Sequence, residues 1–311
     1  MSEKNVIEVK NLTKDYGYGK GVFNVDLNIK EGEMVGFVGT NGSGKTTTIR
    51  SILGFIKPTG GEARVNGLSS WEHASEIIKN VGYVPGEIAF PDLKTGVDFL
   101  NSQKEFLNMN DMSYANELIE RLQLDPRANL KRMSKGMKQK TALVAALMYD
   151  APIIILDEPT TGLDPLMRVT FLDIIKEEHK KGKTIFMSSH NFEELEGICD
   201  KVALISDGHI IDVCDMKTIT DPAEKVFKIE FNNEKDYLDF LKEDYVVTRI
   251  QDIYNQATIK IGADDTAKLL KTLNKYNVKF ISEIPYTLEK HFKEVLKAKR
   301  ENTENVQQSV I

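Results

Sequence analysis

The stretch from Gly39 to Thr47, with the sequence Gly-Thr-Asn-Gly-Ser-Gly-Lys-Thr-Thr, constrains the fold of this chain more than any other segment. It fits the P-loop pattern of glycine, four residues, glycine, lysine and a hydroxyl residue. The apolar run Met34–Val38 before it predicts a buried strand, and the apolar spacing of Thr46–Leu53 after it predicts a helix. In that context the helix N-terminus and successive backbone N–H groups converge on an anion. The stretch therefore predicts a binding site for a nucleoside triphosphate.

The residues of this loop have distinct predicted roles toward the triphosphate. Glycines let the backbone close around phosphate without Cβ clashes. Lys45 would reach the terminal phosphates, and the Thr46 hydroxyl would hold Mg²⁺. The predicted contacts with the nucleotide in this loop are Gly39, Thr40, Asn41, Gly42, Ser43, Gly44, Lys45, Thr46 and Thr47.

Composition limits the classes of protein to which the chain can belong. Its 311 residues suffice for one large or two ordinary domains, and charged residues make up 28% with a net charge of −6. This balance is typical of a soluble cytosolic protein and gives no support for binding nucleic acid. No apolar run approaches the ~20 residues that span a bilayer, so any membrane role is expected to need a separate partner chain. Two cysteines, Cys199 and Cys214, indicate neither a disulfide framework nor a zinc site.

Strands and helices alternate along the first two thirds of the chain. The continuous apolar run Ile153–Leu156 predicts a central parallel strand covered on both faces, and Thr184–Met187 and Val202–Ile205 repeat the pattern. The segment from Leu93 to Met148 is mostly helical in its spacing. This alternation indicates an α/β sheet with right-handed crossovers.

Composition changes at Asp221-Pro222, where we place a domain boundary. Beyond it the predicted order of elements is β-α-β-β-α-β, which resembles a small ferredoxin-like α+β unit, followed by a helix at Leu288–Lys299. The polar residues 301–311 are expected to form a disordered tail. The sequence thus predicts domains at residues 1–220 and 221–300, followed by that tail.

Two carboxylates, Asp157 and Glu158, end the apolar strand Ile153–Leu156. Ligands bind outside the carboxyl ends of parallel strands, so both side chains should face the P-loop. Asp157 suits Mg²⁺, which takes few protein ligands and keeps several waters. Glu158 is placed to polarise the water that attacks the γ-phosphate. The alternative, two solvated acids at a strand end, is the weaker interpretation in a P-loop chain.

Further short motifs follow the P-loop in order. They are Tyr83-Val-Pro-Gly-Glu87, Met133-Ser-Lys-Gly-Met137, Leu156-Asp-Glu-Pro159, Gly162-Leu-Asp-Pro165 and Ser188-Ser-His190. With this series the chain resembles the nucleotide-binding subunits of ABC transporters over residues 6 to 215. The resemblance implies a P-loop α/β core with an antiparallel β subdomain and a helical signature subdomain at residues 93–148. It also implies that the chain hydrolyses ATP with Mg²⁺.

The resemblance assigns roles to residues outside the P-loop. Ser134 and Gly136 lie in the signature motif, which would contact the γ-phosphate of ATP held by a second subunit. Asp164 matches the acid at the interface between the two subunits, and His190 matches the switch histidine that holds the γ-phosphate. Tyr16 lies where the family stacks an aromatic ring on adenine, although Tyr18 is close enough to compete. The implied catalytic groups are then Glu158, His190 and Lys45.

Two motifs depart from the family pattern. The signature reads Met-Ser-Lys-Gly-Met in place of Leu-Ser-Gly-Gly-Gln, and the run Ser134–Gln139 is similar to that of ABC-2-type exporters. At the usual position of the Q-loop glutamine, which contacts metal and the membrane partner, the chain has Gly86 followed by Glu87. Gly86 has no side chain for a metal, so either Glu87 serves as the metal ligand or water fills the position.

The leading hypothesis is the ATPase subunit of a membrane exporter, bound at the cytoplasmic face through a separate polytopic permease. ATP-driven closure of a dimer would move the permease helices. A homodimer is the simpler expectation, and a different partner ATPase stays open. The C-terminal extension ends in a helix that begins Tyr286-Thr-Leu-Glu-Lys-His-Phe292, similar to ABC-2-type exporters, and its role is either dimer stabilisation or regulation.

Two other classes of function compete with this hypothesis. A soluble ABC ATPase that acts on a nucleic-acid or ribosomal partner is the main alternative, but the chain has one P-loop and no long coiled-coil insertion. A regulatory module without hydrolysis is opposed by Glu158 and His190. The transported substrate is not specified by this sequence, because selectivity would lie in the permease.

Overall fold

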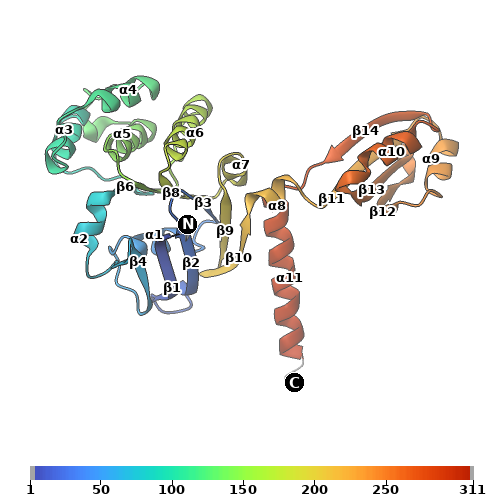
Figure 1. Ribbon diagram of the computed structural model, residues 1–311, viewed down its shortest axis with the longest axis horizontal. Helices are drawn as coiled ribbons and strands as arrows, with labels where there is room; N and C mark the ends of the chain where they lie inside the picture. The colour runs from blue at the N-terminus through green and yellow to red at the C-terminus, as the bar shows by residue number, and fades with distance from the viewer. Residues whose placement is uncertain (1–3, 309–311) are drawn as a thin grey trace. The chain divides into compact units, whose positions relative to one another are not determined.

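The computed structural model describes residues 4–308, with side chains up to residue 301 (Figure 1). The chain separates into two compact units, Met1–Cys214 with Ala298–Ile311 and Asp215–Lys297. The predicted domain boundary after residue 220 falls at the end of the short helix α8 (Met216–Thr220), just beyond the point where the units separate.

A six-stranded sheet lies at the centre of the first unit, with the strand order β10-β9-β3-β8-β7-β6. The pairs β9–β3, β3–β8, β8–β7 and β7–β6 are all parallel, so the carboxyl ends of these strands meet at one edge. Every residue of β3, β7 and β8 is buried, as expected for strands covered on both faces. The strands are β3 Met34–Val38, β6 Val81–Val84, β7 Ile153–Asp157, β8 Thr184–Ser189, β9 Lys201–Ser206 and β10 His209–Asp215.

A second, antiparallel sheet packs against the central sheet and helix α1 (Lys45–Ile52). Its strand order is β2-β1-β4-β5. Leu12 of this sheet, Ile49 of α1 and Phe186 of the central sheet share one core and are fully buried. This is the predicted antiparallel β subdomain. Its strands are β1 Asn5–Asp15, β2 Gly21–Lys30, β4 Gly60–Val65 and β5 Leu68–Ser69.

Helices fill the segment between β6 and β7, as predicted for residues 93–148. Thr95 caps α3 by accepting a hydrogen bond from the Asp98 N–H, and Asp98 accepts one from the Thr95 N–H, which forms a capping box. The helices of the first unit's periphery are α2 Ala74–Ile77, η1 Ile78–Asn80, α3 Gly96–Phe106, α4 Ser113–Arg121, η2 Leu130–Arg132, α5 Lys135–Leu147, α6 Pro165–Lys180 and α7 Phe192–Glu196.

A buried ionic network joins α4 to α6 at Glu178. The fully buried Glu178 carboxylate accepts hydrogen bonds from Tyr114 Oη at 2.6 Å and Lys181 Nζ at 2.6 Å, and it also pairs with Lys183. Burial by itself raises the pKa of Glu178, but these three donors outweigh it and lower the pKa below its usual value. The ionised carboxylate therefore holds α4 against α6.

Glu178→Gln is expected to lower the free energy of unfolding of the first unit by about 3 kcal/mol. The reason is that the buried Lys183 ammonium would lose the negative charge of its Glu178 partner. Since the folded pKa of Glu178 is depressed, its contribution is present above the unfolded pKa and lost as pH falls through the folded value. The difference between wild type and variant should thus shrink below about pH 4. Urea unfolding followed by Trp71 fluorescence measures it.

The matched control is Glu177→Gln at the neighbouring position. Glu177 pairs with Arg121 at 2.6 Å on the surface, so its loss should cost less than about 1 kcal/mol. Equal effects of the two variants would show that the buried network does not stabilise the unit.

The second unit has the predicted β-α-β-β-α-β order around an antiparallel sheet, β12-β13-β11-β14. Phe227, Ile229 and Phe231 of β11 pack on Tyr237 and Phe240 of α9, in a core that also includes side chains of α10. The elements are β11 Glu224–Phe231, α9 Glu234–Phe240, β12 Val246–Gln251, η3 Asp252–Tyr254, β13 Gln256–Gly262, η4 Ala263–Asp265, α10 Thr266–Leu273 and β14 Val278–Ile284.

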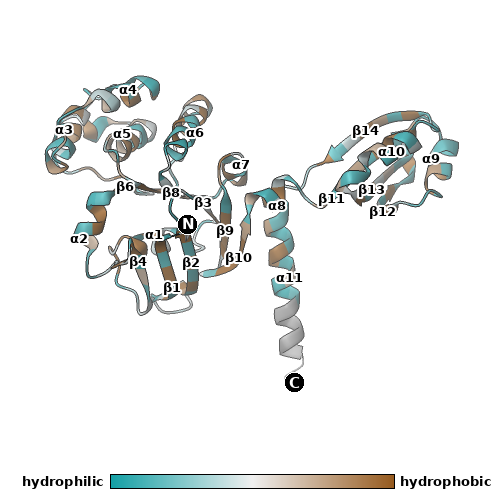
Figure 2. Cartoon of the chain, in the orientation of Figure 1, coloured by the Kyte–Doolittle hydropathy of each residue, from teal (hydrophilic) through white to brown (hydrophobic). Residues whose placement is uncertain are grey.

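The last helix, α11, runs from Leu288 to Gln308. The described backbone is therefore helical through most of the segment predicted as a disordered tail, and residues 309–311 of that segment lie outside the described residues. The Lys, Arg and Glu residues of Leu288–Arg300 are good helix formers, and the i,i+4 ion pair Glu289–Lys293 supports the start of this helix, which continues into residues 301–308. Among residues 4–308 no helix is both long and apolar enough to cross a membrane, and Figure 2 shows hydrophilic residues along helices such as α4 and α6.

Candidate functional site

The loop between β3 and α1 is shaped by glycines that no other residue can replace without strain. Gly42 and Gly44 have φ of +81° and +111°, in the left-handed region. A Cβ atom at Gly39 would lie 2.3 Å from the Ile205 carbonyl oxygen of β9. The first N–H groups of α1 have no partner within the helix, so they are available to an anion at this end. The geometry is that of a phosphate-binding loop.

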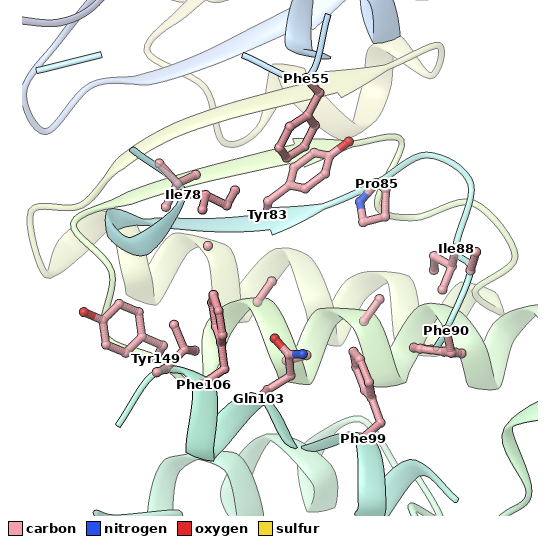
Figure 3. Close-up of a pocket in the computed structure, with 17 residues that line it drawn as sticks. Phe55, Ile78, Tyr83, Pro85, Ile88, Phe90, Phe99, Gln103, Phe106 and Tyr149 are labelled. Atoms are coloured by element: carbon pink, nitrogen blue, oxygen red, sulfur yellow. The ribbon is translucent and has the colours of Figure 1, made fainter. Parts of the chain in front are cut away.

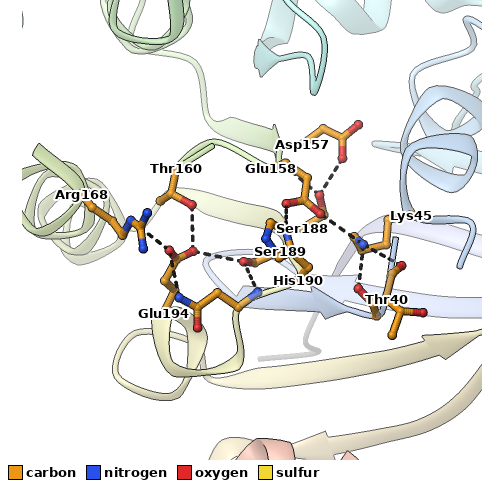
Figure 4. A network of polar contacts seen from close by, with 12 residues as sticks. Thr40, Lys45, Asp157, Glu158, Thr160, Arg168, Ser188, Ser189, His190 and Glu194 are labelled. Carbon is orange, nitrogen blue, oxygen red and sulfur yellow. Dashed lines mark hydrogen bonds and ion pairs between the residues drawn. The ribbon is translucent and has the colours of Figure 1, made fainter. Parts of the chain in front are cut away.

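Lys45, the first residue of α1, lies under this loop with its side chain 6% exposed. Its Nζ donates hydrogen bonds to the carbonyl oxygens of Gly39 at 2.7 Å and Thr40 at 3.1 Å. The same Nζ lies 3.1 Å from Glu158 Oε1 (Figure 4). The structure thus brings the predicted phosphate-binding lysine and the predicted general base into direct contact.

Asp157 at the end of β7 fits a divalent cation. Ser188 Oγ donates a hydrogen bond of 2.6 Å to its Oδ1, while its buried Oδ2 has no hydrogen-bond partner among the described residues. A buried carboxylate oxygen without a partner is costly, and oxygen ligands of this kind suit Mg²⁺. Asp157, with the half-buried Thr46 in the first turn of α1, would hold the ion.

Glu158 has φ of +52°, which is strained for a residue other than glycine. Its N–H donates a 3.0 Å hydrogen bond to Ser188 Oγ, which fixes the turn. Its carboxylate pairs with Lys45 through Oε1 and with His190 Nδ1 through Oε2. His190 directly follows β8 and is 53% exposed. The three predicted catalytic residues therefore converge at the carboxyl edge of the sheet, facing the loop (Figure 4).

A third acid, Glu194 of α7, organises the turns that carry these residues. Its buried Oε2 accepts hydrogen bonds from Thr160 Oγ1 at 2.8 Å and Ser189 Oγ at 3.1 Å, and Arg168 Nε lies 3.4 Å from its Oε1. It thereby links the turn after Glu158, the end of β8 and helix α6 (Figure 4). The sequence predictions missed Glu194, because an acid in the first turn of a helix is common and its partners are distant in sequence.

The predicted signature and interface residues lie next to each other. Ser134 is the N-cap of α5 and its Oγ accepts a hydrogen bond from the Met137 N–H at 3.2 Å. A Cβ atom at Gly136 would lie 2.7 Å from the Gly162 carbonyl oxygen, and Asp164 caps α6. Within the described part of the chain, no hydrogen bond or ion pair joins Ser134 to residues 39–47.

The predicted adenine contact lies in the turn between β1 and β2. Tyr16 is 52% exposed, and Lys14 Nζ lies 5.4 Å from its ring centroid. Tyr18 in the same turn is fully exposed. Both rings are accessible to a base, and the role of Tyr16 stays a prediction.

Gly86, where the motif departs from the family pattern, lies next to Asp157, the candidate metal ligand. A Cβ atom at residue 86 would lie 3.1 Å from Asp157 Oδ2, the oxygen that has no partner. Glu87 is exposed, and among residues 4–308 the structure shows no hydrogen bond or ion pair for it. Gly86 thus leaves space beside the carboxylate, while a metal-binding role for Glu87 stays a prediction.

An apolar pocket of about 280 Å³ lies beside Gly86, between β6 and the helices α3 and α5 (Figure 3). Tyr83 of β6 and Phe55 line one side, in an edge-to-face pair with ring centroids 5.6 Å apart. Phe99 and Phe106 of α3 line the opposite side, and Phe106 is 64% exposed. The pocket is therefore an open aromatic surface adjoining the catalytic edge.

Comparison with known proteins assigns this fold and site to a class. A sequence profile of the family described as ABC transporter matches residues 22–161. Bacitracin transport ATP-binding protein BcrA from Bacillus licheniformis is 35% identical over 213 residues, which are 67% of this chain and 69% of the relative. The uncharacterized ABC transporter ATP-binding protein YdbJ of Bacillus subtilis (strain 168) is 28% identical over 309 residues, covering 97% of this chain and 98% of the relative.

A solved structure supports the same assignment. The dimeric ATP-binding cassette MJ0796 in a post-hydrolysis state with ADP and Pi superposes with a TM-score of 0.61 at 26% identity, covering 68% of this chain and 98% of that chain. The chain belongs to the ATP-binding proteins of ABC transporters. It is an ATP-hydrolysing cassette coupled to transport, which confirms the predicted fold class and enzyme class. Cassettes of this family work as dimers with membrane permease partners.

Proposed function

We propose that this chain is the ATPase subunit of an exporter, in which two copies close on two ATP molecules and move a separate permease in the cell membrane. The observation that carries the proposal is the convergence of Lys45, Glu158 and His190 beside the unpartnered oxygen of Asp157. Export is supported by the signature Met-Ser-Lys-Gly-Met and by the second unit, and a relative is named for bacitracin transport. The permease selects the cargo.

In the proposed mechanism, ATP changes the partners of Lys45. The loop N–H groups and the Lys45 ammonium bind the β- and γ-phosphates, so the ammonium leaves the Glu158 carboxylate. Thr46 and Asp157 would hold Mg²⁺, which would supply positive charge to the phosphate oxygens. Glu158 then accepts a proton from the attacking water, and His190 holds the γ-phosphate.

The second copy completes each site in this proposal. Ser134 and Gly136 lie at the start of α5, where a hydroxyl and helix N–H groups can bind the γ-phosphate. The resemblance of the signature motif to that of ABC transporter subunits, together with the similarity to a dimeric cassette, supports a role for these groups at the ATP held by the other copy. ATP binds the closed dimer better than the open one, and that difference in affinity drives closure.

We also propose that the apolar pocket receives a cytoplasmic helix of the permease. The exposed rings of Phe55 and Phe106, with the half-buried Tyr83 between them in the pocket lining, suit the apolar face of an amphipathic helix. The pocket also includes Pro85, directly before Gly86, so a helix seated there would lie near the metal site. Movement of that segment would therefore connect the state of the nucleotide with the permease.

Phe106→Glu is expected to reduce the recovery of a polytopic membrane protein with the tagged chain by at least about ten-fold, since it places a charge at the apolar contact. ATP hydrolysis by the purified soluble chain should be retained. Affinity purification from detergent-solubilised membranes, with identification of the bound proteins, measures the effect.

The matched control is Leu270→Glu, which changes an exposed leucine of α10 in the second unit and should leave recovery unchanged. Loss of the permease in both variants would argue against this pocket as the docking site. Recovery of ribosomes or nucleic acid in place of a polytopic protein would contradict the exporter proposal and favour the soluble alternative.

A further inference from the structure

The sheet of the second unit has one face that its helices α9 and α10 do not cover. Phe227 and Ile229 of β11 point into the core with those helices, so Val226 and Lys228 lie on the opposite, open face. The register places Lys260 opposite Val226, and Thr258 opposite Lys228. Arg249 of β12 lies opposite Thr258. Strand alternation therefore gathers basic residues from three strands on the open face.

These residues line a hollow of about 500 Å³, whose margin is completed by Lys290 from the start of α11. Four of the lining side chains are cationic, namely those of Lys228, Arg249, Lys260 and Lys290, and none is acidic. The hydroxyl residues Thr248 and Thr258 also line it.

Most of this positive charge is not neutralised. Lys260 pairs with Glu224, and the nearby Glu230 is occupied by Lys279 and Gln256. Within the described residues, Lys228, Arg249 and Lys290 have no ion pair with a carboxylate. Like charges in one hollow repel each other, and a bound anion would relieve that repulsion.

We propose that this hollow binds a small molecule that carries phosphate groups. Its volume lies within the range of about 300–1,000 Å³ of small-molecule sites. The Arg249 guanidinium can bind phosphate through two N–H groups, and lysine ammonium groups add point charges. Lys228 Nζ lies 5.8 Å from the Phe280 ring centroid, so an aromatic surface adjoins the charges.

The surroundings of the hollow favour a small ligand over an extended polyanion. The adjoining pocket, which shares Lys260 and Lys290 with it, is lined by the acids Asp221, Glu224, Glu283 and Glu294. These carboxylates would repel an extended polyanion, such as a membrane surface or a nucleic acid, that spread beyond the basic residues. A compact phosphate compound fits within the basic part alone.

Isothermal titration calorimetry of the full chain with inorganic pyrophosphate tests this proposal. Saturating ADP and Mg²⁺ are present throughout, so that the P-loop is already filled. Wild type is expected to show a binding event in the second unit that weakens at least about ten-fold in the double variant Lys228→Glu, Arg249→Glu. High salt should weaken it as well. The matched control Lys271→Glu, on α10 at the covered face, should bind like wild type.

Circular dichroism checks that the variants fold. If the double variant does not fold, the single variant Lys290→Glu takes its place in the titration. The proposal is overturned if pyrophosphate binding is the same in wild type, the charge-reversal variants and the control, or if no binding occurs outside the ATPase site. Flotation with phosphatidylglycerol vesicles distinguishes a lipid headgroup from a free phosphate compound as the ligand. Vesicle binding that requires Lys228 and Arg249, without pyrophosphate binding, would show a membrane-binding face and also overturn the proposal.

Discussion

Glu158→Gln is expected to slow ATP hydrolysis by about 10²–10⁴-fold while ATP still binds, because the amide cannot accept a proton from the attacking water. The side chain has the position that this role requires, since one carboxylate oxygen contacts Lys45 and the other contacts His190. The change from carboxylate to amide keeps its shape and removes its charge. Phosphate release measures the rate, and light scattering in ATP should detect an accumulating dimer.

Glu193→Gln is the matched control for this variant. Glu193 is an exposed acid in the first turn of α7, close in sequence to His190, and its amide should hydrolyse ATP at the wild-type rate. If Glu158→Gln also hydrolyses ATP normally, Glu158 is not the general base. A slow variant that does not form an ATP-dependent dimer would instead contradict the proposed closure of two copies.

The sequence was sufficient to predict the parts of the site that depend on local structure. The strand, glycine loop and helix around Lys45 follow from one motif and its apolar flanks. Asp157 and Glu158 could be placed beside the P-loop because parallel strands end at the same edge of a sheet, whereas His190 was assigned only through the resemblance to ABC transporter subunits. The ferredoxin-like unit followed from the order of its elements, which fixes a small set of topologies.

Other features depend on contacts between distant residues and could not be predicted in this way. Glu194 acts through Thr160, Ser189 and Arg168, and only the folded chain brings these residues together. The basic hollow of the second unit depends on strand register, because a shift of one residue would turn Lys228 into the core. The helical backbone at residues 301–308 also differs from the expected tail, since polarity alone does not distinguish a solvated helix from disorder.

Asp157→Asn is expected to raise the Mg²⁺ concentration needed for half-maximal ATP hydrolysis by about 10–100-fold, the usual effect of losing a supporting group at a metal site. Asp157 Oδ1 is held by Ser188, so Oδ2 is the oxygen free to face the ion or a water bound to it. An amide at this position carries no negative charge. Magnesium titrations of phosphate release measure the shift, and Mg²⁺-dependent thermal stabilisation by ATP measures it without turnover.

Glu87→Ala in the same magnesium titrations shows whether Glu87 or water takes the place of the side chain that Gly86 lacks. If Glu87 replaces the usual glutamine as a metal ligand, its variant should shift the Mg²⁺ requirement in the same direction as Asp157→Asn. If water fills the space beside Asp157 Oδ2, Glu87→Ala should match wild type, because glycine at residue 86 leaves the space that a Cβ atom would take 3.1 Å from that buried oxygen, and the exposed Glu87 is not needed there. An unchanged Mg²⁺ requirement in Asp157→Asn would remove Asp157 from the metal site, and neither explanation of Gly86 would then be needed.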